Sequence, residues 1–103
     1  MIDEIDAVLA MTEGLSAEQI VDDYRNRRAV ERAIQIISEA AKELPPEVRA
    51  EEPDMPWASI IGIGNMLRHE YYRIKVEHVQ DIVLSHLPQL RPAVARLLAR
   101  HGA

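Results

Sequence analysis

A regular stripe of apolar side chains in the middle of the chain is the feature that most restricts its fold. Its members step by four, three, four and three residues, and they are Val30, Ile34, Ile37, Ala41 and Leu44. This near-heptad spacing puts all of them on one side of an α-helix, so it predicts a long helix with one buried face. Pro45 and Pro46 end that helix, because the residue before a proline is driven out of the α region.

Shorter signals of the same kind divide the rest of the chain into helices. Apolar residues at helical spacing predict a helix over 2–12, and Ser16 with Gln19 forms a capping box for a short helix over 17–23. A connector over 45–56, with one turn at 47–50, leads to a fourth helix from Pro56 to about residue 70. Pro88 cannot donate a backbone hydrogen bond, so the last apolar stripe predicts two helices, near 75–86 and 88–101.

These elements predict an all-α protein, an antiparallel up-down bundle with four main helices and short extra helices. The 103 residues fit one domain, 1–103. Cysteine is absent, which excludes disulfides and thiolate metal sites. No apolar stretch approaches the roughly 18 residues of a membrane span, and the N-terminus is acidic where a signal peptide is basic. We therefore expect a cytoplasmic protein without membrane contact.

The charge of the chain argues against a general nucleic-acid binder. A formal net charge of −5 opposes broad attraction to a polyanion, and no DNA partner is expected. Local basic clusters nevertheless leave RNA binding open. One consists of Arg25, Arg27, Arg28 and Arg32, and the other of Arg68, Arg73 and Lys75. The alternative is that both clusters are solvated helix faces.

Polar chemistry is concentrated at the end of the predicted fourth helix. His69 has a side chain whose ordinary pKa suits proton transfer at neutral pH, although a histidine can also simply occupy a helix C-terminus, where the dipole favours it. Asn65 lies four residues earlier and shares a helix face with His69, so it either orients the imidazole or binds a neighbouring helix. The remaining histidines, His78, His86 and His101, lack a second ligand at the spacing a metal site needs. We expect no metal and no cofactor.

The segment from Leu44 to Tyr72, with its Leu-Pro-Pro-Glu opening, resembles the HepT-like branch of the HEPN superfamily. His69 and Tyr71 match the His-x-Tyr half of that family's motif. The resemblance implies a homodimeric toxin that cuts RNA as a metal-independent endoribonuclease. It also implies a minimal nucleotidyltransferase antitoxin that neutralises the toxin by transferring AMP onto Tyr71, because a bulky anion beside the catalytic histidine fills the substrate phosphate site.

One position departs from the family pattern. The motif arginine belongs five residues before His69, and Gly64 stands there. Gly62 and Gly64 in one helix suggest a close helix–helix approach, for which a two-fold dimer contact is one explanation. Arg68 is the nearby cation able to replace the arginine. Two functions therefore remain open: a ribonuclease using His69, Arg68 and Asn65, or a catalytically weakened or inactive dimer that serves as an interaction module for the antitoxin.

Overall fold

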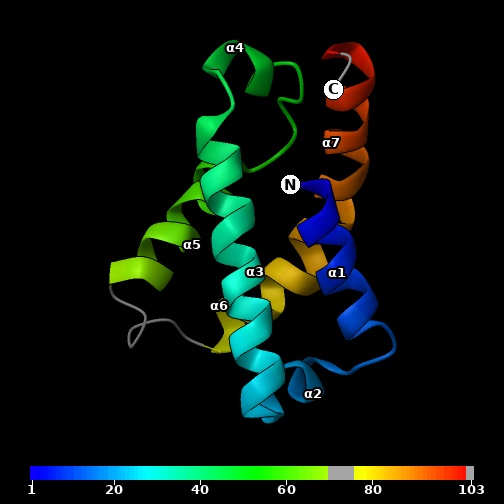
Figure 1. The fold of residues 1–103 in the computed structure, drawn as a ribbon, viewed down its shortest axis with the longest axis vertical. Coiled ribbons are helices and arrows are strands. Elements are labelled where there is room, and N and C mark those ends of the chain that lie inside the picture. The colour runs from blue at the N-terminus through cyan, green and yellow to red at the C-terminus, as the bar shows by residue number, and fades with distance from the viewer. Residues whose placement is uncertain (70–75, 102–103) are drawn as a thin grey trace.

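The computed structural model describes residues 1–69 and 76–101, and at positions 68, 69 and 76 it describes the backbone alone. Four main helices run alternately down and up, as Figure 1 shows, and they are α1 (Ile2–Thr12), α3 (Tyr24–Glu43), α5 (Trp57–His69) and α7 (Leu87–His101). Shorter elements join them: α2 (Ala17–Asp22), α4 (Pro46–Arg49), α6 (Val76–Asp81) and the π-helical turn η2 (Ile82–His86). The predicted antiparallel all-α bundle is confirmed.

Local capping signals fix the helix boundaries where the sequence places them. Gln19 donates its backbone N–H to Ser16 Oγ at 3.2 Å, and Ser16 N–H donates to Gln19 Oε1 at 2.8 Å, which completes the predicted capping box of α2. The carboxylate of Asp23 caps α3 by accepting from the backbone N–H groups of Arg25 and Asn26. At the other end, α3 stops at Glu43, since Leu44 is extended ahead of Pro45.

The apolar stripe of α3 lies at the centre of the core. Val30, Ile34, Ile37 and Ala41 are buried. They pack with buried aliphatic side chains of the other helices, among them Ile5, Val8, Ile20, Ile60, Val79, Leu87 and Leu90. Aliphatic residues thus provide most of the core, while Trp57 uses its indole N–H to bond the carbonyl oxygens of Arg49 and Glu52 at 3.0 and 3.1 Å. These two bonds fasten the start of α5 to the connector.

Pro88 acts differently from the simple break that the sequence predicts. Helical residues continue from Val76 to His101, and the predicted interruption takes the form of η2, in which Leu87 N–H bonds Ile82 O five residues back. Pro88 lies in the first turn of α7 and lacks the N–H that an α-helix would use there. The wider π-helical turn η2 accommodates the position at which this hydrogen-bond donor is missing. The second helix begins at Leu87, close to the predicted position.

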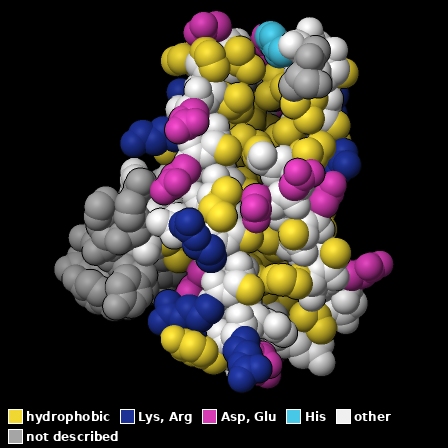
Figure 2. Space-filling model, viewed as in Figure 1, with side chains coloured by type: hydrophobic (Ala, Val, Ile, Leu, Met, Phe, Trp, Pro, Cys, Tyr) yellow, Lys and Arg dark blue, Asp and Glu magenta, His cyan; other side chains and the backbone are white. Residues whose placement is uncertain are grey.

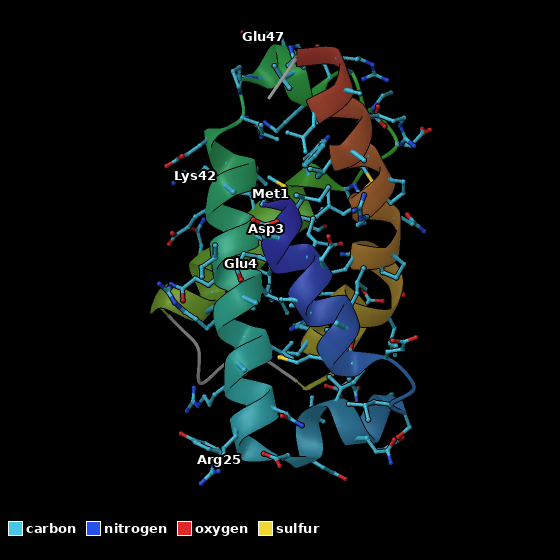
Figure 3. The ribbon with its side chains drawn as sticks, turned by 45° about the vertical axis from the view of Figure 1, so that its right-hand side comes forward. Met1, Asp3, Glu4, Arg25, Lys42 and Glu47 are labelled. Carbon is cyan, nitrogen blue, oxygen red and sulfur yellow. The ribbon has the colours of Figure 1, made fainter. Side chains whose placement is uncertain are left out.

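Carboxylates of the connector bind the last helix. Glu52 is only 7% exposed and accepts hydrogen bonds from Arg96 Nε, at 3.1 Å to Oε1. Arg100 approaches the same carboxylate at 3.0 Å, and His101 Nε2 lies 3.0 Å from Glu51 Oε2. Figure 3 shows Glu47 of α4 at this end of the bundle and Arg25 at the opposite end of α3. None of the described helices is long and apolar enough to cross a membrane.

Candidate functional site

Gly64 lies against α3 of the same chain. A Cβ atom built at Gly64 would overlap the hydroxyl of Ser38 and would lie 2.5 Å from its Cβ, whereas Ser38 Oγ donates to Ile61 O at 2.9 Å. The glycine therefore allows α3 and α5 to approach closely within one protomer. Ile60 and Ile63 are also buried inside the chain. A two-fold contact is not needed to explain Gly64, and these three positions do not form a free face.

The sequence-predicted polar residues occupy the last turns of α5. Asn65 is exposed, and the backbone of α5 carries Arg68 and His69 as its final residues, with their side chains outside the described part. Tyr71, together with Arg73 and Lys75, lies outside the described residues altogether. His69 follows Gly62 by seven residues, about two turns, so the two positions lie on one side of the helix. Arg68 is displaced by about 40° from Gly64.

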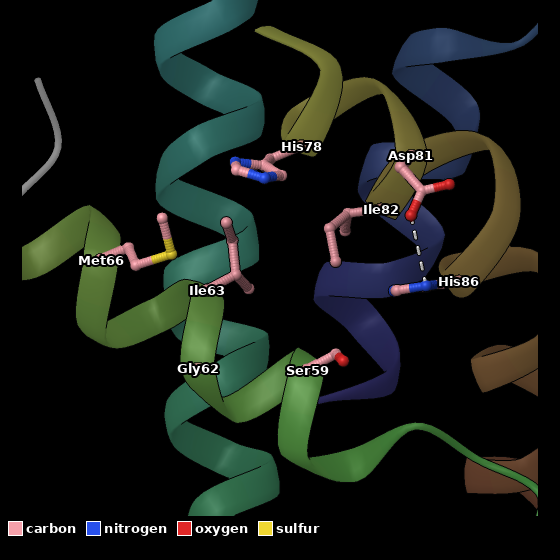
Figure 4. A pocket seen from close by; sticks show the side chains of 8 residues that line it. All are labelled: Ser59, Gly62, Ile63, Met66, His78, Asp81, Ile82 and His86. Atoms are coloured by element: carbon pink, nitrogen blue, oxygen red, sulfur yellow. Dashed lines mark ion pairs between the residues drawn. The ribbon is translucent and has the colours of Figure 1, made fainter. Parts of the chain in front are cut away.

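A pocket of about 330 Å³ opens beside Gly62, between α5 and the α6–η2 segment (Figure 4). We refer to it as the α5–α6 pocket, and its lining residues are Ser59, Gly62, Ile63, Met66, His78, Asp81, Ile82 and His86. A Cβ at Gly62 would meet no atom within 4 Å, so backbone forms part of the wall. The floor is apolar, and polar groups converge on it from α6 and η2, an arrangement typical of ligand sites.

Two of the histidines that looked isolated in the sequence, His78 and His86, line this pocket. His86 Nε2 lies 3.5 Å from Asp81 Oδ2, and His86 Nδ1 is buried without a hydrogen-bond partner among the described residues. Asp81 and His86 are five residues apart, which on an α-helix places them about 140° from each other. The π-helical turn brings them to the same side. Sequence spacing alone gave no signal for this pair, because it assumed a regular helix.

The basic cluster of α3 is largely exposed and makes ion pairs and hydrogen bonds along its own helix. Glu31, which is 9% exposed, pairs with Arg27 at 3.1 Å and with Arg28 at 3.4 Å. Arg32 donates to Gln35 Oε1 at 3.2 Å. Beside them a hollow of about 200 Å³ separates α3 from the end of α5, and it is lined by Arg28, Glu31, Arg32, Gln35 and Leu67. We call it the α3–α5 hollow.

No group of three or more metal-binding side chains occurs within 1–69 and 76–101. Among the residues that the structure describes, Glu52 and Arg96 have clearly shifted pKa values. The hydrogen bond from Arg96 lowers the pKa of Glu52 against the opposing effect of burial, and the same bond raises the pKa of Arg96. These shifts mark a structural ion pair between the connector and α7.

Known proteins match this chain over almost its whole length. The family profile "Ribonuclease HepT-like" matches residues 1–97. "Putative RNase TTE0752" of Caldanaerobacter subterraneus is 31% identical over 100 residues, which cover 97% of this chain and 89% of that protein. "Probable ribonuclease HepT" of Thermococcus cleftensis is 27% identical over 93 residues, 90% and 84% of the two chains. "Putative RNase MJ0127" of Methanocaldococcus jannaschii is 26% identical over 88 residues, 85% and 73%. No solved structure gives a significant match.

Proposed function

The chain belongs to the HepT-like ribonuclease family, and from this premise we propose that it is a metal-independent endoribonuclease, the toxin of a cytoplasmic toxin–antitoxin pair. The family profile over residues 1–97 is the observation that carries the proposal. His69 at the end of α5, with Asn65 one turn before it, supplies the side chains for such chemistry. The three relatives reported above, each named as an RNase or ribonuclease, support the RNA substrate.

The proposed reaction needs a base, an acid and a cation. His69 accepts the proton of the 2′-hydroxyl, whose oxygen attacks the adjacent phosphorus, and the bond from phosphorus to the 5′-oxygen breaks. A protonated imidazole returns a proton to that leaving oxygen. Arg68 stabilises the charge that develops on the phosphoryl oxygens, in place of the motif arginine at position 64. Asn65 orients the imidazole of His69.

A homodimer would bring two copies of the proposed catalytic residues together. Ala58, Gly62 and Asn65 are spaced by four and three residues along α5, none of them is buried, and His69 continues the same stripe four residues later. We propose this stripe as the two-fold contact, since Ile60, Ile63 and Gly64 of the same helix are buried inside the protomer. Two copies of α5 paired in this way place both copies of His69 at one cleft, so that one can act as base and the other as acid.

Cleavage of a mixed-sequence RNA in the presence of a chelator tests the enzymatic proposal. His69→Ala and Arg68→Ala should each lower the rate by about a hundred- to a thousandfold, the loss typical of one removed electrostatic donor. His101→Ala and Arg91→Ala are the matched controls, because both are exposed side chains of α7 that pair with carboxylates of other segments, Glu51 and Asp6. An Arg68→Ala protein that cuts as fast as wild type would exclude Arg68 as the replacement cation.

We further propose that a minimal nucleotidyltransferase antitoxin transfers AMP onto Tyr71. Mass spectrometry of the protein incubated with that antitoxin and ATP should find AMP on Tyr71 and none on Tyr71→Phe. Tyr24 is a demanding internal control, since its ring is 69% exposed and accessible to any nonspecific transfer. AMP on Tyr24 or Tyr72 in the wild-type protein would contradict the assignment.

The second candidate function rests on Gly64. Position 64 holds glycine instead of the motif arginine, and α3 fills the space that a side chain at this position would need. A dimer that binds the antitoxin but cuts RNA no faster than His69→Ala would be the interaction module. Comparing the wild type with His69→Ala in both assays separates the two functions.

A further inference from the structure

We propose that an exposed strip of α3, formed by Tyr24, Arg28 and Arg32, binds the single-stranded part of the RNA that flanks the cleavage site. The inference rests on the proposed ribonuclease function and deepens it. The three residues are spaced by four, so they lie along one face of α3 over about 12 Å. Figure 2 shows basic side chains gathered over the lower part of α3. We call these three residues the α3 strip.

The strip begins with a stacked pair that suits an unpaired base. The Arg28 guanidinium carbon lies 5.1 Å from the centre of the Tyr24 ring, and that ring is 69% exposed. A planar cation over an exposed phenol offers a flat surface next to a phosphate-binding group. Bases of single-stranded RNA stack on such side chains, whereas bases of a duplex are already stacked on each other. The pair therefore favours a single strand.

The strip continues toward the proposed catalytic residues. Arg28 and Arg32 line the α3–α5 hollow, which Leu67 closes from the side of α5. Leu67 lies in the last turn of α5, directly before Arg68, so a strand lying along the strip would reach the end of that helix. Glu31 lies between the arginines, and its nearly buried carboxylate is 3.1 Å from Arg27 and 3.4 Å from Arg28. It holds the guanidinium groups in place on the helix.

Charge also points to a polyanionic ligand. The whole chain carries a formal charge of −5, so a concentration of arginines on one helix is a local exception. Guanidinium groups bind phosphate oxygens in a bidentate manner, which lysine cannot do. An acidic surface of the antitoxin would meet the same arginines, but it would not require the exposed ring of Tyr24. The single-stranded RNA is therefore the better match.

Fluorescence anisotropy with a labelled single-stranded RNA oligonucleotide tests the proposal, using His69→Ala as the background that prevents cleavage. We expect Arg32→Gln to weaken binding about tenfold and to reduce the slope of log affinity against log salt by about 0.7, the value for one phosphate contact on a single strand. Tyr24→Ala should weaken single-strand binding several-fold and Tyr24→Phe should restore it. The same RNA annealed into a duplex should not respond to Tyr24→Ala. Arg91→Gln, a paired surface arginine of α7, is the control.

Kinetics separate failure of the strip from failure of the proposed function. In cleavage assays the strip variants should raise KM and leave kcat unchanged, since they hold the strand away from the reacting atoms. If wild type cuts RNA, but Arg32→Gln and Tyr24→Ala bind and cut RNA as wild type does, the proposed role of the α3 strip is wrong and the proposed ribonuclease activity is retained. If single-stranded RNA binds through the α3 strip but is not cut, the RNA-binding role of the strip is confirmed and the catalytic proposal is wrong. Loss of antitoxin binding in these variants, with RNA binding intact, would make the strip a protein-binding surface and overturn the inference.

Discussion

Gly62 and Gly64 lie two residues apart in α5 and have opposite surroundings. A Cβ at Gly64 would overlap Ser38, while a Cβ at Gly62 would meet nothing within 4 Å. Replacing the glycine by alanine should therefore change the free energy of unfolding in opposite directions at the two positions. At Gly62 it gains helix propensity without a clash, and at Gly64 it forces two helices apart.

We predict that Gly64→Ala lowers the free energy of unfolding by about 1–3 kcal/mol, the usual cost of overpacking. Gly62→Ala, its matched control, should raise it by about 0.5–1 kcal/mol when unfolding is followed at a dilution where the protein is monomeric, because the added methyl group meets no atom of its own protomer. Adding Ser38→Gly should recover part of the loss in Gly64→Ala. Ser38→Ala should not, because its Cβ would still lie 2.5 Å from the new methyl group. Urea unfolding of the four single and double variants measures these differences, and equal stability of Gly64→Ala and wild type would disprove the close approach.

At the scale of helices, the connector and α7 are joined by the ion pair of Glu52 with Arg96 and Arg100. The pKa of Glu52 is lowered from its ordinary value of 4.5, chiefly by the hydrogen bond from Arg96. A carboxyl group whose pKa is depressed in the folded state contributes stability at pH values above the unfolded pKa. That contribution is lost as pH falls through the folded value.

We accordingly predict that the urea midpoint of wild type declines as pH falls below 4.5, and that Glu52→Gln flattens part of this decline. At neutral pH the variant should be less stable than wild type, because Arg96 and Arg100 lose a charged partner. Glu47→Gln, an exposed change on the neighbouring α4, is the control. Identical acid profiles for wild type and Glu52→Gln would contradict the role of this ion pair.

Helix existence was predictable from the sequence, and the contacts between helices were not. Ser16, Gln19 and Pro45 act within a few residues of their own position, so their signals could be read directly. Gly64 indicated a close approach, but its neighbour Ser38 is far away in the sequence, so the pattern could not distinguish a contact with α3 from a dimer contact. Asp81 and His86 meet only because of the π-helical turn, which regular spacing cannot predict.

At the scale of the whole molecule, the prediction concerns assembly. Wild type should sediment as a dimer at micromolar concentration, and Gly62→Arg should sediment as a folded monomer, since a Cβ at position 62 meets no atom of its own protomer within 4 Å. Gly64→Leu should instead lower the thermal midpoint by separating α3 from α5. A wild-type monomer would remove the shared cleft from the mechanism, and a dimeric Gly62→Arg would move the interface away from α5.

The contact between Gly64 and Ser38 also bears on how such a protein can evolve. A codon change that restored arginine at position 64 would put the new side chain into α3, so the fold would oppose it before any benefit to RNA cleavage could be selected. A change at position 38 would be needed first, and that change by itself loses the bond to Ile61 O. We therefore expect substitutions at the two positions to be epistatic. In a chain that keeps this helix contact, a cation for RNA cleavage would have to come from a residue other than 64.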